Sequence, residues 1–313
     1  MKKNNIVFSL TTRGFYSELF NLSLAQVYAH HYGLKLKINS WLWNFRIDKG
    51  WEDYFEPVLK NANNPLSAQD NVYTKEKPWI GKIYYKPKEF FTFYYRILAN
   101  CLYSIFHPNT MLTKDVFADM RSEHFINDVL GKDAFNLLAE AYKHIYILNA
   151  ETKKNIEKAK KFLNLPNEYI GVHIRRGDKI TSEEMKEIHN DKYINEIIKH
   201  SDTCKYIYIA TDDISIINEF RAILEPLGIK VYYNSLNNSK GYDLEKFNKA
   251  TKQARREEAI NVLLDMDILI HSIFFIGTYT SNLSRVVPFY LGQDNCVSLD
   301  NVWNIINSAN GLQ

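Results

Sequence analysis

The 313-residue sequence contains little cysteine and no long apolar run. Its three cysteines, at 101, 204 and 296, are odd in number and too far apart for a zinc site. We therefore expect reduced thiols, with Cys204 and Cys296 as small core residues. A membrane-spanning helix needs about 20 apolar residues, and no segment has them. Since the N-terminus also lacks the apolar run of a signal peptide, we expect a cytoplasmic protein without a membrane span.

Several common catalytic and nucleotide-binding motifs are also missing. The sequence has no G-x-x-x-x-G-K-[ST] phosphate loop, no G-x-G-x-x-G turn, no nucleophile-elbow serine and no H-E-x-x-H motif. The sequence therefore does not indicate a kinase, a common dehydrogenase, an α/β-hydrolase or a zinc protease. Lys and Arg number 39 against 36 Asp and Glu, a net charge of +3. This balance does not indicate nucleic-acid binding.

Strand-like and helix-like segments alternate in the sequence, and 46% of its residues are hydrophobic, enough for a full core. Residues 5–10, 15–33 and 34–39 form a strand–helix–strand pattern, the start of a parallel sheet. Further helices are expected over 88–106, 132–148 and 149–166. The 149–166 pattern ends at Pro166, where we place the domain boundary, giving an N-terminal α/β domain (1–165) and a C-terminal domain (166–313).

The C-terminal domain has the more regular pattern. Strands alternating with helices predict a Rossmann-like doubly wound sheet. The expected strands are 169–174, 205–210, 229–234, 274–279 and 295–299. The expected helices are 182–201, 214–228, 243–272 and 281–292.

Three tryptophans fall within eleven residues of the segment SWLWNFRIDKGWEDYFEP, which begins at Ser40. One interpretation is a packed, loop-rich part of the core. The other is a stacking platform for a flat ligand such as a sugar.

Three expected strands of the C-terminal domain end in polar clusters: HIRRGDK (173–179), ATDD (210–213) and TYTSN (278–282). Ligands of open parallel sheets bind beyond the carboxyl ends of the strands, so the three clusters predict one shared ligand site. Asp213 is expected to cap the helix at 214. Carboxylates here could bind a metal, but no partner stands at suitable spacing, and we expect no metal site.

The first cluster contains Arg175 and Arg176, whose planar guanidinium groups suit phosphate oxygens. Gly177 allows a tight turn, and a following helix could add backbone donors. A diphosphate leaving group would fit such a site. The alternatives are a surface ion-pair cluster in which Asp178 pairs with one arginine, and an adhesion ligand built on Arg-Gly-Asp, which the missing secretion signal disfavours. His173 could equally be a hydrogen-bonded core residue.

Together these segments resemble the signatures of the α1,6- and α1,2-fucosyltransferase group. GVHIRRGDK is similar to the first signature, His-Val-Arg-Arg-x-Asp, and YIYIATDD to the second. LLDMDILIHSIFFIGTYTSNLSRVVPFY is similar to the third, and the Trp-rich segment has a counterpart in the family. The α1,6 branch is the nearer one, because Lys179 stands where the α1,2 branch usually has tyrosine.

The resemblance implies a two-domain, GT-B-like α/β glycosyltransferase. It implies inverting transfer of L-fucose from GDP-β-L-fucose to a glycan hydroxyl, with an α1,6-like linkage and no metal or other cofactor. The partners would be GDP-fucose and a glycan acceptor, bound by the C-terminal and N-terminal domains respectively. Two alternatives stay open: a transferase of another linkage or nucleotide sugar, such as an α1,2-fucosyltransferase, and a non-catalytic nucleotide-sugar or glycan-binding protein.

On the donor side, the resemblance implies that His173 and Asp265 hold the guanine and that Arg175 holds the β-phosphate. Arg176 would support that loop or the acceptor. Ser281 and Asn282 would face the nucleotide or its phosphates, although the family has glutamine where Asn282 stands.

The resemblance implies that Asp178, Lys179 and Glu183 form the acceptor side of the site. Glu183 would be the general base, and the adjacent Glu184 leaves the choice between neighbours open. Two further residues are weaker candidates for the site: Asp212, and Tyr193, which is displaced by one position from the family pattern.

Overall fold

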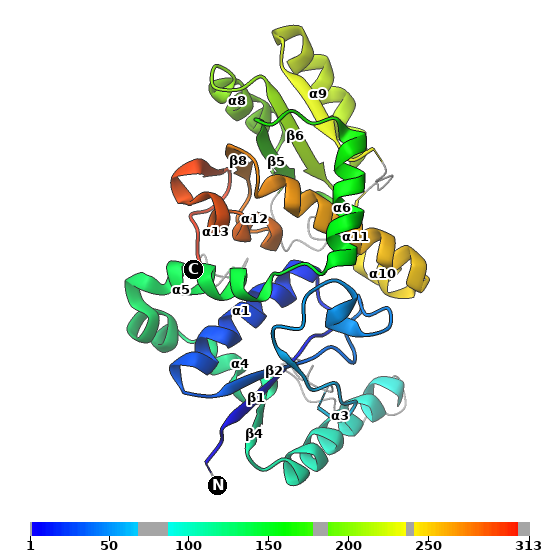
Figure 1. The fold of residues 1–313 in the computed structure, drawn as a ribbon, viewed down its shortest axis with the longest axis vertical. Coiled ribbons are helices and arrows are strands. Elements are labelled where there is room, and N and C mark those ends of the chain that lie inside the picture. The colour runs from blue at the N-terminus through cyan, green and yellow to red at the C-terminus, as the bar shows by residue number, and fades with distance from the viewer. Residues whose placement is uncertain (1, 68–86, 178–186, 236–240, 306–313) are drawn as a thin grey trace. The chain divides into compact units, whose positions relative to one another are not determined.

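The computed structural model describes residues 2–67, 87–177, 187–235 and 241–305. The chain divides into two compact units, Met1–Asn149 and Ala150–Gln313. The sequence-based boundary at Pro166 differs from this division. Helix α6 (Ala150–Leu163) packs against α11 (Lys252–Leu269), and Lys160 Nζ lies 2.9 Å from Asp267 Oδ2. These contacts make α6 part of the second unit (Figure 1).

The first unit is built on the expected strand–helix–strand segment. Strand β1 (Asn5–Ser9), helix α1 (Phe15–His31) and strand β2 (Lys35–Asn39) follow one another, and the two strands pair in parallel. Two short strands, β3 (Lys60–Asn61) and β4 (Thr110–Leu112), complete a parallel sheet in the order β3-β2-β1-β4. Neither was predicted, because two or three residues are too few to show a period of two.

The expected helices of the first unit are α3 (Pro87–Phe106) and α5 (Ala134–Ile145). Helix α4 (Thr113–Met120) and a π-helical segment (His124–Leu130) were not predicted. Helix α5 packs against α1.

The tryptophans of the Trp-rich segment have two different environments. Trp43 and Trp51 are buried in an aromatic cluster with Phe15, Phe45, Tyr54 and Phe55. The core interpretation is therefore correct for these two. Trp41 is 41% exposed, and the Arg46 guanidinium lies 4.6 Å from the centre of its ring.

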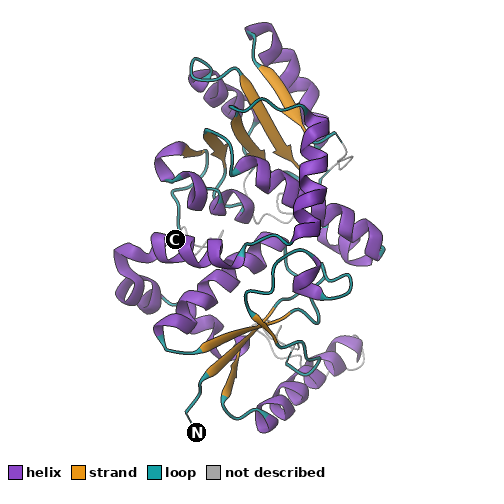
Figure 2. Cartoon of the chain, in the orientation of Figure 1, coloured by secondary structure: helices purple, strands orange, loops and turns teal. Residues whose placement is uncertain are grey.

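The second unit contains the five predicted strands in one parallel sheet, ordered β7-β6-β5-β8-β9 (Figure 2). The strands are β5 (Ile170–Ile174), β6 (Tyr206–Thr211), β7 (Lys230–Tyr233), β8 (Phe274–Gly277) and β9 (Cys296–Ser298). This arrangement confirms the expected Rossmann-like sheet.

Helices cover both faces of this sheet. On one face, α8 (Asn190–His200) and α9 (Ile217–Leu224) pack against Val172 and Ile174. On the other face, Gly171 approaches the end of α11, where an added Cβ would lie 3.0 Å from Leu269. The remaining helices are α10 (Leu244–Lys249), α12 (Asn282–Val286) and α13 (Pro288–Leu291).

The single helix expected over 243–272 is two helices, α10 and α11. Thr251 separates them, because its hydroxyl accepts a hydrogen bond from the Ala254 N–H and caps α11. Cys204 is buried as expected, and Cys296 is partly buried. No helix in the described ranges is long and apolar enough to cross a membrane.

Candidate functional site

The three polar clusters meet at one edge of the second unit's sheet. Strands β6, β5 and β8 are neighbours and run parallel, so the segments that follow them emerge side by side. This confirms the expectation that the three clusters share an edge. Such an edge is where open α/β sheets bind ligands.

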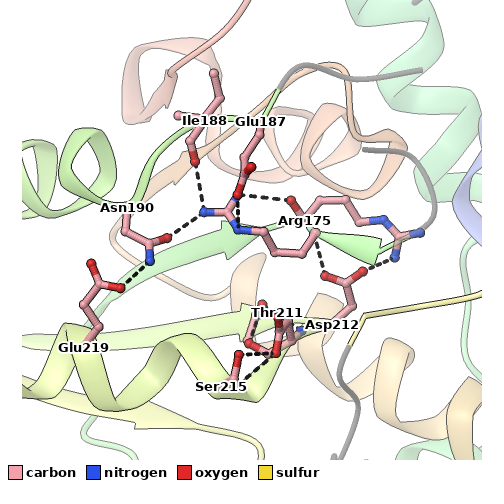
Figure 3. Close-up of polar contacts among 10 residues, drawn as sticks. Arg175, Glu187, Ile188, Asn190, Thr211, Asp212, Ser215 and Glu219 are labelled. Atoms are coloured by element: carbon pink, nitrogen blue, oxygen red, sulfur yellow. Dashed lines mark hydrogen bonds and ion pairs between the residues drawn. The ribbon is translucent and has the colours of Figure 1, made fainter. Parts of the chain in front are cut away.

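Arg175 lies at this edge, directly after β5, and its side chain is only 16% exposed. Its Nη1 is 2.8 Å from Asp212 Oδ2, in the segment after β6 (Figure 3). Its guanidinium also lies 5.0 Å from the centre of the Tyr242 ring. An ion pair and a cation–π contact therefore hold a largely desolvated cation in place.

Arg176 has different partners. Its Nη2 donates to Ile188 O at 2.9 Å and to Asn190 Oδ1 at 2.6 Å, at the start of α8. Its backbone N–H donates to Asp212 Oδ1 at 2.7 Å. Figure 3 shows Asn190 in turn donating to Glu219 of α9. Arg176 therefore ties the segment after β5 to α8, while Arg175 stays at the sheet edge.

Gly177 brings two backbone segments into close contact. Its φ is +36°, and a Cβ at this position would lie 2.5 Å from Tyr242 O. A Cβ on Gly241 would lie 3.1 Å from the Gly177 Cα. Asp212 Oδ2 accepts a hydrogen bond from the Tyr242 N–H at 3.1 Å. Glycine is therefore required where the segments after β5 and β7 pack together.

His173 is buried near the end of β5, on the face that carries α12. Its Nδ1 forms a hydrogen bond of 2.7 Å with Ser284 Oγ. Burial, together with the positive charge of Arg175, lowers the pKa of His173 to about 3. The imidazole is therefore neutral at physiological pH, and it offers a polar group without charge.

Two carboxyl groups of α11 also have shifted pKa values. Asp265 is buried, and its Oδ1 accepts a hydrogen bond of 2.6 Å from the Tyr208 hydroxyl. Burial raises the pKa of Asp265 to about 7. Burial also raises the pKa of Glu258, against the opposing effect of Arg175. A carboxyl group that titrates near neutrality is typical of binding and catalytic sites.

These groups also influence one another electrostatically. Arg175 lowers the pKa values of both His173 and Glu258, and the charge of Glu258 raises that of Asp265. The fold thus gathers a cation, a neutral imidazole and two carboxyl groups from β5 and α11. Such a set can bind an anion at Arg175 and hydrogen-bond a polar heterocycle beside it.

The segment after β8 is fixed by Asp300. This carboxylate accepts hydrogen bonds from the N–H groups of Tyr279 at 2.8 Å and Thr280 at 3.1 Å. Ser281 is buried at the N-cap of α12, and Asn282 Oδ1 accepts from Arg285 Nη2 at 2.7 Å. Sequence reasoning missed Asp300, although it directly follows the expected last strand.

The remaining candidate residues include some that are buried or cap a helix and some that lie outside the described ranges. Tyr193, a residue of α8, is buried in the core, and burial raises its pKa. Asp213 caps the following helical turn, as expected, by accepting from Ser215 N–H at 3.0 Å. Tyr242 and Glu258 were not predicted. Four acceptor-side candidates lie outside the described residues: Asp178, Lys179, Glu183 and Glu184.

Among the residues that the structure describes, no group of three or more histidine, cysteine, aspartate or glutamate side chains could hold a metal ion. Asp212, which directly follows β6, pairs with Arg175.

Comparison with known proteins shows the family. Residues 14–298 match the family model of α-(1,6)-fucosyltransferase N- and catalytic domains. A crystal structure of NodZ α-1,6-fucosyltransferase co-crystallized with GDP is 16% identical, with 93% of each chain covered and a TM-score of 0.52. Fucosyltransferase NodZ from Bradyrhizobium is 17% identical, covering 93% of this chain and 94% of that one, with a TM-score of 0.51.

A third structure, POFUT1 in complex with GDP-fucose, is 14% identical, with 97% and 99% covered and a TM-score of 0.53. At these identities the likeness is one of fold, and it confirms the predicted GT-B-like α/β architecture. The family match runs from the turn before α1 to the end of β9, so it includes the three polar clusters described above. The chain therefore belongs to the α1,6-fucosyltransferase family of glycosyltransferases.

Proposed function

We propose that this protein transfers L-fucose from GDP-β-L-fucose to a hydroxyl of a glycan acceptor, with inversion and an α1,6-like linkage. The main support for the proposal is the position of Arg175, a largely buried cation that contacts Asp212 and Tyr242 at the carboxyl edge of the sheet. A diphosphate is the chemical group that best fits such a guanidinium.

In the proposed complex, Arg175 binds the β-phosphate of GDP. The guanine contacts His173 and Asp265, whose carboxylate accepts hydrogen bonds from the N–H groups of the base. Ser281 and Asn282, at the start of α12, face the nucleotide or its phosphates. The shifted pKa values of His173 and Asp265 support this assignment, because they mark polar groups kept away from water.

In the reaction, the bond between the fucose anomeric carbon and the β-phosphate oxygen breaks. The acceptor oxygen forms its bond from the opposite face, which converts the β-linked donor into an α-linked product. Negative charge grows on the leaving phosphate, and Arg175 neutralises it with a fixed charge. The acceptor hydroxyl loses its proton to a general base, for which we propose Glu183.

We further propose that the reaction needs no metal ion, because Arg175 supplies the positive charge that a divalent cation would otherwise provide. Turnover that is unchanged by EDTA is the expected result. Loss of turnover in EDTA, restored by a divalent cation, would contradict this part of the proposal.

The test is incubation of the protein with GDP-fucose and an array of glycans, read by mass spectrometry. The expected result is a gain of one deoxyhexose on a subset of acceptors, and the linkage is then assigned by NMR. Glu183→Gln should abolish transfer while leaving GDP affinity unchanged, as measured by calorimetry. Binding of GDP-fucose without transfer or hydrolysis would favour a binding protein and overturn the proposal.

A further inference from the structure

Helix α3 of the first unit exposes many large apolar side chains. Five of them form one stripe, because residues three and four apart lie on the same side of a helix. Their exposed fractions are 53% for Tyr95, 59% for Leu98, 38% for Leu102, 70% for Ile105 and 73% for Phe106. We call these five residues the α3 stripe. Monomeric soluble proteins rarely expose contiguous apolar surface of this kind without a binding role.

A side of α3 next to the stripe holds the helix on its unit. Ala99, Asn100 and Tyr103 are buried there, and Tyr103 packs against Val7 of β1 and Leu112 of β4. Figure 1 shows α3 in cyan, close to β4. The helix is therefore attached by one narrow side, and the α3 stripe is not the side that forms the core.

The charges around the α3 stripe are mostly basic. Residues 88–114 contain one acidic residue, Glu89, against the basic residues Lys88, Arg96 and Lys114. Lys114 pairs with Asp115, the first acidic residue after the helix. Beyond the C-terminal end of α3, Lys2 and Lys3 are exposed, and Lys3 Nζ donates to Thr110 O at 3.1 Å. Apolar surface bordered by cations matches the surface of an anionic bilayer.

We propose that the α3 stripe docks on membranes that contain anionic phospholipids, with α3 lying in the plane of the interface. Two stripes paired with each other would place one surface with an excess of basic residues against another, which disfavours a second copy of the chain as the occupant. No described helix could span the bilayer, so the attachment is peripheral. The apolar side chains would enter the acyl boundary, and the lysines would meet the headgroups.

The test uses the full-length protein and vesicle flotation. Vesicles of phosphatidylcholine with phosphatidylglycerol should carry the protein upward, and 0.5 M NaCl should weaken the attachment. The double variant L98E/I105E should lower the bound fraction at least about tenfold, because two apolar side chains no longer enter the bilayer. Leu137→Glu is the matched control, since Leu137 is 37% exposed on α5 of the same unit. It should float like the wild type.

A second measurement does not depend on the stability of the variants. Cys101 is exposed on α3, whereas Cys204 is buried. An environment-sensitive fluorophore on Cys101, in a Cys296→Ser background, should shift to the blue when anionic vesicles are added. No flotation, or equal flotation with phosphatidylcholine alone, would overturn the proposal. So would concentration-dependent dimers that L98E/I105E abolishes, because the occupant would then be a second copy.

Discussion

The carboxyl edges of the two parallel sheets use their polar residues in different ways. In the first unit, Glu18 is fully buried and accepts hydrogen bonds from the Thr11 N–H at 3.1 Å and hydroxyl at 2.8 Å. Its Oε1 is also 2.5 Å from Arg13 Nε. In the second unit, Arg175 is largely buried and its charge lowers the pKa of His173, while burial raises the pKa of Asp265 on α11.

This difference separates polar groups that serve the fold from those available to a ligand. Glu18 binds partners within eight residues of sequence, which fixes the turn into α1. The groups of the second unit come from elements far apart in sequence, and burial makes some of them costly to keep charged. We therefore expect substitutions at the first edge to change stability, and those at the second to change transfer.

The largest expected effect is that of Arg175→Ala. Loss of a fixed donor to the leaving phosphate should slow fucosyl transfer by about 100- to 1,000-fold, or about 2.7–4 kcal/mol in the barrier. Initial rates with GDP-fucose measure it. Arg221→Ala is the control, because Arg221 stacks on Tyr233 in the same unit, outside the three clusters. Equal losses in the two variants would show that the effect is structural.

Gly177→Ala tests the packing of the segments that surround Arg175. The new Cβ would meet backbone atoms of Tyr242, so we expect a stability loss of about 1–3 kcal/mol and slower transfer. Gly228→Ala is the control, since Gly228 has a φ of +77° but nothing within 4 Å of an added Cβ. It should cost only the backbone strain, about 1–2 kcal/mol, with transfer unchanged. Urea unfolding measures the stability of the two variants, and initial rates measure their transfer.

Glu18→Ala tests the first edge. Removal of the buried carboxylate leaves the Thr11 N–H and hydroxyl without their partner, which should lower the free energy of unfolding by about 1–3 kcal/mol. The affinity for GDP, measured by calorimetry, should not change. Glu140→Ala on the exposed side of α5 should alter neither quantity. If Glu18→Ala weakened GDP binding without a stability loss, the proposed contrast between the edges would be wrong.

The last prediction is a pH dependence of stability from Asp265. Its pKa is about 7 in the folded protein, above the ordinary value of 3.8. The folded state therefore keeps a proton that the unfolded chain has lost, and stability falls as pH rises from about 4 to 7. His173, with its lowered pKa, works in the opposite direction, so stability is lost as pH falls from 6.5 to about 3. The difference between wild type and Asp265→Asn isolates Asp265, and identical pH profiles would contradict its assignment.

The sequence predicted the second unit better than the first. Buried parallel strands such as β5 and β6 are continuous apolar runs, which are visible without any alignment. Strands β3 and β4 are too short to show a pattern. The division between the units precedes the predicted boundary because α6 packs on α11, a tertiary contact that its mostly polar sequence does not reveal.

The site was predictable where its residues directly follow strands. Arg175 and Asp212 stand at such positions, so strand pattern and topology brought them together. Tyr242 lies in an irregular segment, and Glu258 lies on a helix whose pattern does not reveal which side meets the edge. The contact of Tyr242 with Arg175, and the electrostatic effect of Arg175 on Glu258, depend on distances that sequence spacing does not encode.

The carboxylate of Asp212 has a consequence for any anion that enters the site. It already serves as an internal counter-ion, since it accepts from Arg175 and from the backbone N–H groups of Arg176 and Tyr242. An incoming anion must share Arg175 with the Asp212 carboxylate or displace it, and this competition weakens the net attraction of the anion to Arg175. The same contacts orient the Arg175 guanidinium and hold the neighbouring turns in place, so the site is preorganised for an anion.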